Sequence, residues 1–282
     1  MSRLIWLLFL LLPMQSHTSN CEHQETKPAL VIIDVVDWLN PEHQIRHQSA
    51  VLQQILQKLP VPFQIEHITR NRARQYVQEH PTACMPWLLK TPERTQQYLF
   101  STPYMVEHAL QLVTLRDSPL SARFERDSKV GPIQLQQLLN ERRPPVLGIE
   151  TNRSYGQQTD RLLATLEHSS AIYTRTSSSN QPAELLPMLQ RGFIDLMIDY
   201  EVVLYEHREA LSFFPYAETE PFQLSHFACS NSAEMRSILP KLNQAIHALS
   251  TDPEFRQLIM QSIPSHQQAQ GWEYLKAAQQ NP

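Results

Sequence analysis

The fold is decided by residues 29–69, which read ALVIIDVVDWLNPEHQIRHQSAVLQQILQKLPVPFQIEHIT. Residues 29–36 form a short apolar run rich in β-branched side chains, which predicts a buried strand. Residues 47–59 place apolar side chains at helical spacing, and the prolines that follow end this helix. Residues 63–69 alternate between apolar and polar side chains and predict a second strand. A strand, a helix and a strand in succession are typical of an α/β fold.

The alternation of strands and helices continues along the chain. Further strands are predicted at residues 83–89, 107–115, 146–150, 193–198 and 222–229. Further helices are predicted at residues 72–79, 132–140, 157–168, 182–191, 232–249 and 253–261, and the last two finish the chain. We therefore expect an α/β fold with mixed, largely parallel sheets flanked by helices.

Two breaks divide this pattern into lobes. A polar segment covers residues 116–130, and a proline-rich joint covers residues 141–145. The closing segment has no complete sheet of its own, so we expect it to return to the first block. The predicted lobe 1 contains residues 27–115 and 223–282, and the predicted lobe 2 contains residues 116–222. Two lobes linked by two crossovers form a hinged clamp, with a ligand in the crevice between them.

The first twenty residues have the three-part form of a secretory signal peptide. Arg3 gives a positive start, residues 4–12 form an apolar run, and small polar residues follow. This run is shorter than the roughly 20 apolar residues that cross a membrane. We expect residues 1–20 to be removed and the mature chain to be periplasmic. Cys21 follows directly, but residues 18–20 are a poor context for lipid attachment.

Two further cysteines, Cys84 and Cys229, lie far apart in the sequence. An oxidising compartment favours a disulfide between them, and two buried free thiols are the alternative. Neither cysteine has an obvious activating base nearby, so we do not expect a catalytic thiol.

Composition excludes several classes of protein. Lys and Arg (24) are fewer than Asp and Glu (28), and the net charge is −4. We therefore expect no nucleic-acid partner. Only 5 of 282 residues are glycine and no two lie close together, so no phosphate-binding loop can be written. We expect no cofactor.

Motifs for catalysis and metal binding are also missing from the sequence. There is no G-x-S-x-G motif of an α/β-hydrolase. His43 and His47 share a helical spacing, but no H-E-x-x-H motif accompanies them, so we expect no metal site. Asp195 and Asp199 lie along a predicted strand and are not an evident acid–base pair. We expect no enzyme activity.

Residues 90–94, KTPER, and residues 100–104, FSTPY, resemble the signature of family 3 extracellular solute-binding proteins. Residues 188–195, MLQRGFID, resemble the turn into the second-lobe strand of that family, and residues 148–156 resemble its strand and helix start. The resemblance covers nearly all of the mature chain and points to a divergent branch. It implies the two-lobed type II periplasmic binding protein fold, a small-molecule ligand, a monomer, and a membrane permease or membrane sensor as partner.

The resemblance places Arg94 where amino-acid binders of the family hold the ligand carboxylate. A guanidinium presents a planar fork that matches a carboxylate in bidentate fashion. Thr91 is expected to cap the helix that carries Arg94 and to contact the ligand. The alternative for Arg94 is a surface arginine at the start of a helix.

Other candidate ligand residues come from both predicted lobes. Ser154 and Tyr155, with Gly156, lie where a strand gives way to a helix, and free N–H groups at a helix start favour anions; an ordinary capped turn is the alternative. Trp38 follows the first strand and either contacts the ligand or packs in the core. Arg72 is a candidate second cation.

The sequence departs from the family pattern at two places. Family amino-acid binders carry small polar donors just before the arginine, but residues 87–89 here are Trp-Leu-Leu. The family's acid for the ligand ammonium falls here on Tyr200, with Asp199 one residue short, and one residue changes the face of a strand. Both remain candidate ligand residues. A carboxylate-bearing or aromatic ligand therefore fits better than a standard α-amino acid.

The sequence thus predicts a periplasmic solute-binding protein that closes its two lobes on a small, carboxylate-bearing metabolite for ABC-type uptake or sensing. One alternative is the ligand-sensing subunit of a membrane signalling protein. Another is a dehydratase-like enzyme on the same fold, acting on aromatic precursors.

Overall fold

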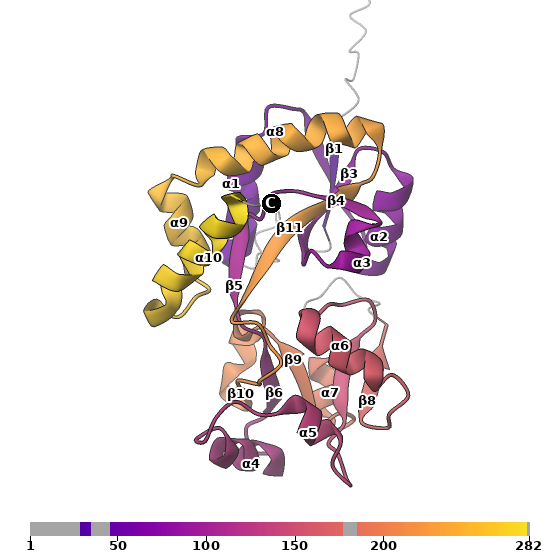
Figure 1. The fold of residues 1–282 in the computed structure, drawn as a ribbon, viewed down its shortest axis with the longest axis vertical. Coiled ribbons are helices and arrows are strands. Elements are labelled where there is room, and N and C mark those ends of the chain that lie inside the picture. The colour runs from indigo at the N-terminus through magenta and orange to yellow at the C-terminus, as the bar shows by residue number, and fades with distance from the viewer. Residues whose placement is uncertain (1–28, 35–45, 177–184, 281–282) are drawn as a thin grey trace, which may run out of the picture.

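The computed structural model describes residues 29–34, 46–176 and 185–280. It contains two β-sheets, each with its own helices, stacked along the long axis of the molecule (Figure 1). We call the part built on the first sheet lobe 1 and the part built on the second sheet lobe 2. The predicted signal peptide, Cys21, Trp38 and His43 lie outside the described residues.

The sheet of lobe 1 has the strand order β2-β1-β3-β11-β4, and β5 also pairs with β11. Its strands are β1 (Leu30–Asp34), β2 (Phe63–His67), β3 (Ala83–Leu88), β4 (Tyr98–Phe100), β5 (Met105–His108) and β11 (Phe222–Ser230). Strand β1 pairs in parallel with β2 and β3, and β11 runs antiparallel to its partners. The strand, helix and strand expected within residues 29–69 are confirmed, with α1 at Arg46–Gln57.

Helices cover both faces of this sheet, so β1 is buried on both sides. Leu30 and Ile32 pack with α1, α8 (Ala233–Leu249), α9 (Pro253–Met260) and α10 (Gln268–Gln280). Val31 and Ile33 point to the other face and pack with α2 (Arg70–Glu79). Such alternation along one strand is the pattern of a sheet between two helical layers.

The sheet of lobe 2 has the strand order β10-β6-β9-β7-β8. Its strands are β6 (Gln111–Leu115), β7 (Leu147–Glu150), β8 (Ile172–Arg175), β9 (Leu196–Asp199) and β10 (Leu211–Phe214). Its helices are α4 (Pro119–Asp127), α5 (Leu135–Leu139), α6 (Gln157–Thr165), α7 (Leu186–Gln190) and the 3-10 helix η2 (Glu201–Ala210). Leu112 packs on the side of α5 and α6, and its neighbour Val113 packs on the side of α7 and η2.

Residues 107–115 are not the single strand that the sequence predicts. The chain leaves lobe 1 at the end of β5 and enters lobe 2 at β6, with Ala109 and Leu110 between them. Both halves keep an extended backbone and buried side chains, so the apolar run cannot reveal that its strands belong to different sheets. The chain returns to lobe 1 between β10 and β11 (Figure 1).

The sequence prediction also missed helices α4 and α10. The polar segment at 116–130 contains α4, whose N-terminus is capped by Ser118 and which buries Phe124. The chain does not finish with α9, because α10 follows and buries Gly271, Trp272 and Leu275. Strands β4, β8 and β10 were also absent from the sequence prediction. Among the described residues, no helix is long and apolar enough to cross a membrane.

Cys84 and Cys229 form the predicted disulfide. Cys84 lies on β3 and Cys229 lies on β11, and the two residues face each other in the antiparallel pairing with a Cα–Cα distance of 4.0 Å. The bond therefore ties two central strands of lobe 1 across 145 positions of sequence.

Candidate ligand-binding site

A cavity of about 960 Å³ opens between the two lobes. Residues 89–93 line it from lobe 1, and Ser154, Gly156 and Asp160 line it from lobe 2. Figure 1 shows α3 (Pro92–Thr95) of lobe 1 facing α6 of lobe 2. Two of the predicted ligand residues, Thr91 and Ser154, thus lie on opposite walls of one cavity.

Arg94 reaches from α3 to lobe 2. The Thr91 hydroxyl accepts a hydrogen bond from the Arg94 backbone N–H at 3.3 Å, so the expected cap of this short helix is present. The guanidinium donates to the Leu89 carbonyl at 2.9 Å through Nη1 and to the Asn152 carbonyl at 3.0 Å through Nη2. Burial lowers the pKa of Arg94. The side chain therefore lies at the contact between the lobes.

Arg74 on α2 meets the same oxygen. Its Nη2 donates to the Asn152 carbonyl at 2.9 Å, and its Nη1 donates to Asn71 at 2.9 Å. Burial, followed by the neighbouring charges of Arg94 and Arg70, lowers the pKa of Arg74 to about 10. Two guanidiniums of lobe 1 thus converge on one carbonyl oxygen of lobe 2.

The sequence pointed to Arg72 rather than Arg74 as the second cation. Arg72 is exposed, and two residues along a helix turn a side chain by about 200°, so Arg72 and Arg74 lie on different faces. The four-residue spacing of Arg70 and Arg74 places both on one helix face, and this spacing could have pointed to Arg74 instead of Arg72.

Three N–H groups around the start of α6, those of Tyr155, Gly156 and Gln158, have side-chain acceptors within the protein. Asp160 accepts from the Tyr155 N–H at 2.7 Å and from the Ser154 hydroxyl. Glu220 accepts from the Gln158 N–H at 3.4 Å. Burial raises the pKa of Asp160. This helix start is therefore capped by the protein's own carboxylates. Ser154 lines the cavity, but its hydroxyl already donates to Asp160.

Tyr155 and Tyr200 are both part of the packing of lobe 2. Tyr155 is buried, and its hydroxyl accepts from the Glu150 N–H at 2.8 Å. Tyr200 is partly buried against the lobe 2 core, and burial raises its pKa.

Asp199 at the end of β9 is 3% exposed, and its carboxylate is ion-paired with Arg153 at 2.6 Å. It also accepts from the Tyr200 N–H at 2.9 Å. Arg153 was missed in the sequence analysis. It lies 46 positions from Asp199, so no local sequence pattern indicates this ion pair.

Trp87 gives lobe 1 an indole where the family pattern has a small donor. Its backbone is left-handed, with a φ of 65°, and its N–H donates to the Tyr104 hydroxyl at 2.9 Å. The indole Nε1 donates to Asp34 at 3.1 Å. Trp87 therefore joins the ends of β1 and β3.

His226 on β11 makes the stability of the protein sensitive to acid. It lines the cavity, is 6% exposed, and donates from Nδ1 to the Ser101 carbonyl at 2.8 Å. Burial lowers its pKa from 6.5 to about 4. As the pH falls from about 6.5 to about 4, the unfolded chain takes up a proton that the folded chain does not, so the free energy of unfolding falls.

We expect the His226 contribution to cost about 2 kcal/mol between pH 7 and pH 5. Urea unfolding of the wild type and of His226→Gln at both pH values measures it, because the glutamine does not titrate. An equal loss of stability in the two proteins would contradict the assignment to His226.

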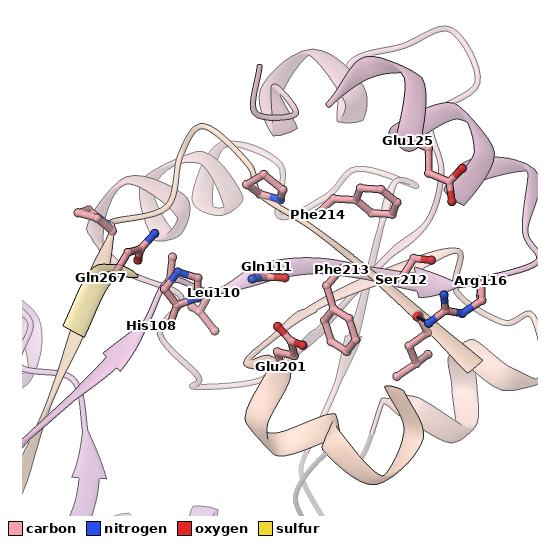
Figure 2. Close-up of a pocket in the computed structure, with 14 residues that line it drawn as sticks. His108, Leu110, Gln111, Arg116, Glu125, Glu201, Ser212, Phe213, Phe214 and Gln267 are labelled. Carbon is pink, nitrogen blue, oxygen red and sulfur yellow. Dashed lines mark hydrogen bonds between the residues drawn. The ribbon is translucent and has the colours of Figure 1, made fainter. Parts of the chain in front are cut away.

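A second cavity of about 730 Å³ lies at the hinge. Figure 2 shows His108 and Gln267 at one end and Arg116, Ser212 and Glu125 at the other, with Phe213 and Phe214 between them. The Arg116 guanidinium donates to the backbone carbonyls of Arg208, Glu209 and Leu211. Those predicted ligand residues that the structure describes do not line this cavity, so the inter-lobe site remains the candidate.

Over the described part of the chain, no group of three or more His, Cys, Asp or Glu side chains is arranged to hold a metal ion.

Comparisons with known proteins agree on the fold. A family model described as bacterial extracellular solute-binding proteins, family 3, matches residues 47–263. A search of curated protein sequences found no significant match.

Solved structures with the same fold include the arginine-, lysine-, histidine-binding protein ArtJ from Geobacillus stearothermophilus, at 13% identity and a TM-score of 0.61, covering 86% of this chain and 100% of that one. A histidine kinase sensor domain with similarity to periplasmic binding proteins matches at 12% identity and a TM-score of 0.61, covering 83% and 95%. The ancestral amino-acid-binding protein AncCDT-1, a precursor of cyclohexadienyl dehydratase, matches at 16% identity and a TM-score of 0.59, covering 83% and 95%.

Proposed function

Because the chain belongs to the bacterial extracellular solute-binding proteins, family 3, we propose that it is a periplasmic receptor for a small, carboxylate-bearing metabolite. The observation that carries the proposal is the convergence of Arg74 and Arg94 on the Asn152 carbonyl. Both guanidiniums belong to lobe 1 and the oxygen belongs to lobe 2. A ligand carboxylate offers the same acceptor chemistry with a full negative charge and two oxygens.

The proposed binding step exchanges one acceptor for another. The ligand carboxylate replaces the Asn152 carbonyl on the Arg94 fork, and the lobes close around the ligand. The ligand shifts the population toward the closed form because that form offers contacts from both lobes. The cavity beside Thr91 and Ser154 gives the rest of the ligand room.

We propose that the closed, loaded monomer is then read by a membrane protein. An ABC-type permease is the first candidate and a membrane sensor is the second, and both respond to the same closure. Co-purification with each class of membrane protein in the presence and absence of ligand separates them. We propose no catalysis, and a search for turnover of prephenate-like acids tests the dehydratase alternative.

Replacing Arg94 with alanine is expected to weaken binding of the ligand carboxylate by at least about 30-fold, because removing one partner of a buried charge pair costs about 2 kcal/mol or more. A thermal-shift screen of small carboxylic acids identifies the ligand, since 100-fold excess over Kd adds about 2.7 kcal/mol of stability. Isothermal titration calorimetry then compares the wild type with Arg94→Ala.

Arg126→Ala is the matched control, since Arg126 is exposed on α4 of lobe 2 and its side chain bonds, among the described residues, only to the nearby Ala122 carbonyl. It is expected to bind as the wild type does. Equal affinity of Arg94→Ala and wild type for every acid that binds would reject the proposed function.

A further inference from the structure

Arg153 places a guanidinium on the acidic end of the lobe 2 sheet. It lies in the loop between β7 and α6. Its Nη2 lies 2.6 Å and its Nη1 lies 3.3 Å from the two carboxylate oxygens of Asp199, and Nη1 also donates to Glu150 at 3.2 Å. The guanidinium carbon lies 5.1 Å from the centre of the Tyr155 ring. Arg153 is thus held by two carboxylates and an aromatic face.

This arrangement leaves Asp199 little capacity for another cation. The Arg153, Asp199 and Glu150 side chains are 17%, 4% and 10% exposed. Burial lowers the pKa of Arg153, but the charges of Asp199 and Glu150 outweigh it and raise that pKa well above its ordinary value. A ligand ammonium would have to displace a cation that the backbone keeps at the site, which is a competition against a tethered group.

The contact next to Arg153 in the same loop has an excess of positive rather than negative side chains. Arg74 and Arg94 meet at Asn152, one residue before Arg153. Over the described residues, the hydrogen-bond acceptors of these two guanidiniums are neutral: Leu89, Asn71 and Asn152. The charges of Asp160 and Glu93 act on Arg94, and the charge of Glu150 acts on Arg74, but none of these carboxylates accepts a hydrogen bond from either guanidinium. Two guanidiniums that make no hydrogen bond to a carboxylate within the described residues favour a ligand that carries two negative charges.

We propose that Arg153 is a specificity-determining residue: a built-in cation that occupies the acidic end of β7 and β9, so that the cleft selects small dicarboxylates without an amino group. The inference rests on the proposed function and names the ligand class for the same site. Arg153 excludes the ammonium of an amino acid, while Arg74 and Arg94 receive the two carboxylates of a dicarboxylate.

Matched acid pairs test this selectivity. Calorimetry compares succinate with aspartate and 2-oxoglutarate with glutamate, because each pair shares its carbon skeleton and its two carboxylates. The wild type is expected to bind the amine-free acid at least 10-fold more tightly in the pair that fits. In Arg153→Met, which uncovers Asp199 and Glu150, this preference is expected to fall at least 10-fold.

The neutral control is the triple variant Arg153→Met, Glu150→Gln, Asp199→Asn, which removes the cation and both acids together. It is expected to keep the wild-type preference, because no acid is uncovered. Circular dichroism verifies the fold of each variant. If Arg153→Met does not fold, Arg153→Gln replaces it, because its neutral amide can still donate a hydrogen bond to Asp199. A preference in Arg153→Gln equal to that of the wild type overturns the inference.

Two results separate the inference from the proposed function. If amino acids bind the wild type as tightly as their amine-free partners and Arg94→Ala abolishes that binding, the selectivity inference is overturned and the proposed function stands. If Arg153→Met folds and keeps the wild-type ratio, the inference is also overturned. If no carboxylic acid binds the wild type, both are rejected.

Discussion

Replacing Arg153 with alanine is expected to lower the free energy of unfolding by about 3–5 kcal/mol, because it leaves the buried carboxylates of Asp199 and Glu150 without their cation. The same guanidinium also packs over the Tyr155 ring. Urea unfolding at neutral pH measures the loss as a lower midpoint with an unchanged slope.

The exposed Arg126 provides the comparison for this stability experiment. Arg126→Ala is expected to change the free energy of unfolding by less than about 0.5 kcal/mol. The triple variant that also neutralises Glu150 and Asp199 is expected to recover part of the loss, because it leaves no buried charge unpaired. A loss below about 1 kcal/mol in Arg153→Ala would mean that solvent or another cation compensates the two acids.

Replacing Cys84 and Cys229 together with alanine is expected to cost about 5 kcal/mol in the chain-entropy model, because the closed loop is long. The bond joins β3 to β11, so the variant also lacks the covalent tie between the strand before Arg94 and the strand that leaves the hinge. The free energy of unfolding of the oxidised wild type and of the double variant, from urea titrations, gives the difference.

Reduced wild type serves as the control, since it loses the bond and keeps both sulfur atoms. It is expected to unfold close to the midpoint of the double variant. If the oxidised protein and the double variant unfold at the same urea concentration, the disulfide does not restrict the unfolded chain.

Local patterns carried most of the fold prediction. The apolar runs of β1 and α1 lie in neighbouring stretches of sequence, so their periodicity was sufficient. Strands β5 and β6 belong to different sheets, which depends on tertiary structure and cannot be read from one continuous apolar pattern. Helix α10 was missed because its glutamine-rich sequence contains few apolar side chains, although Trp272 and Leu275 are buried.

The candidate site could be predicted only where a motif marks its residues. Arg94 and Thr91 belong to the KTPER stretch, and both lie at the inter-lobe contact. Glu220 caps α6 from 62 positions away, so the sequence around Ser154 could not indicate that the helix start was already capped. Distant partners of this kind require coordinates.

Under the proposed function, the Asn152 carbonyl shared by Arg74 and Arg94 lowers the affinity for the ligand. This oxygen is then an intramolecular competitor of the ligand carboxylate, because it accepts a hydrogen bond from each of the two guanidiniums. The apparent Kd equals the intrinsic Kd divided by the fraction of molecules whose cleft is accessible, so it rises as that fraction falls. We therefore expect two hydrogen bonds to one backbone oxygen to raise the ligand concentration at which half of the protein molecules are occupied.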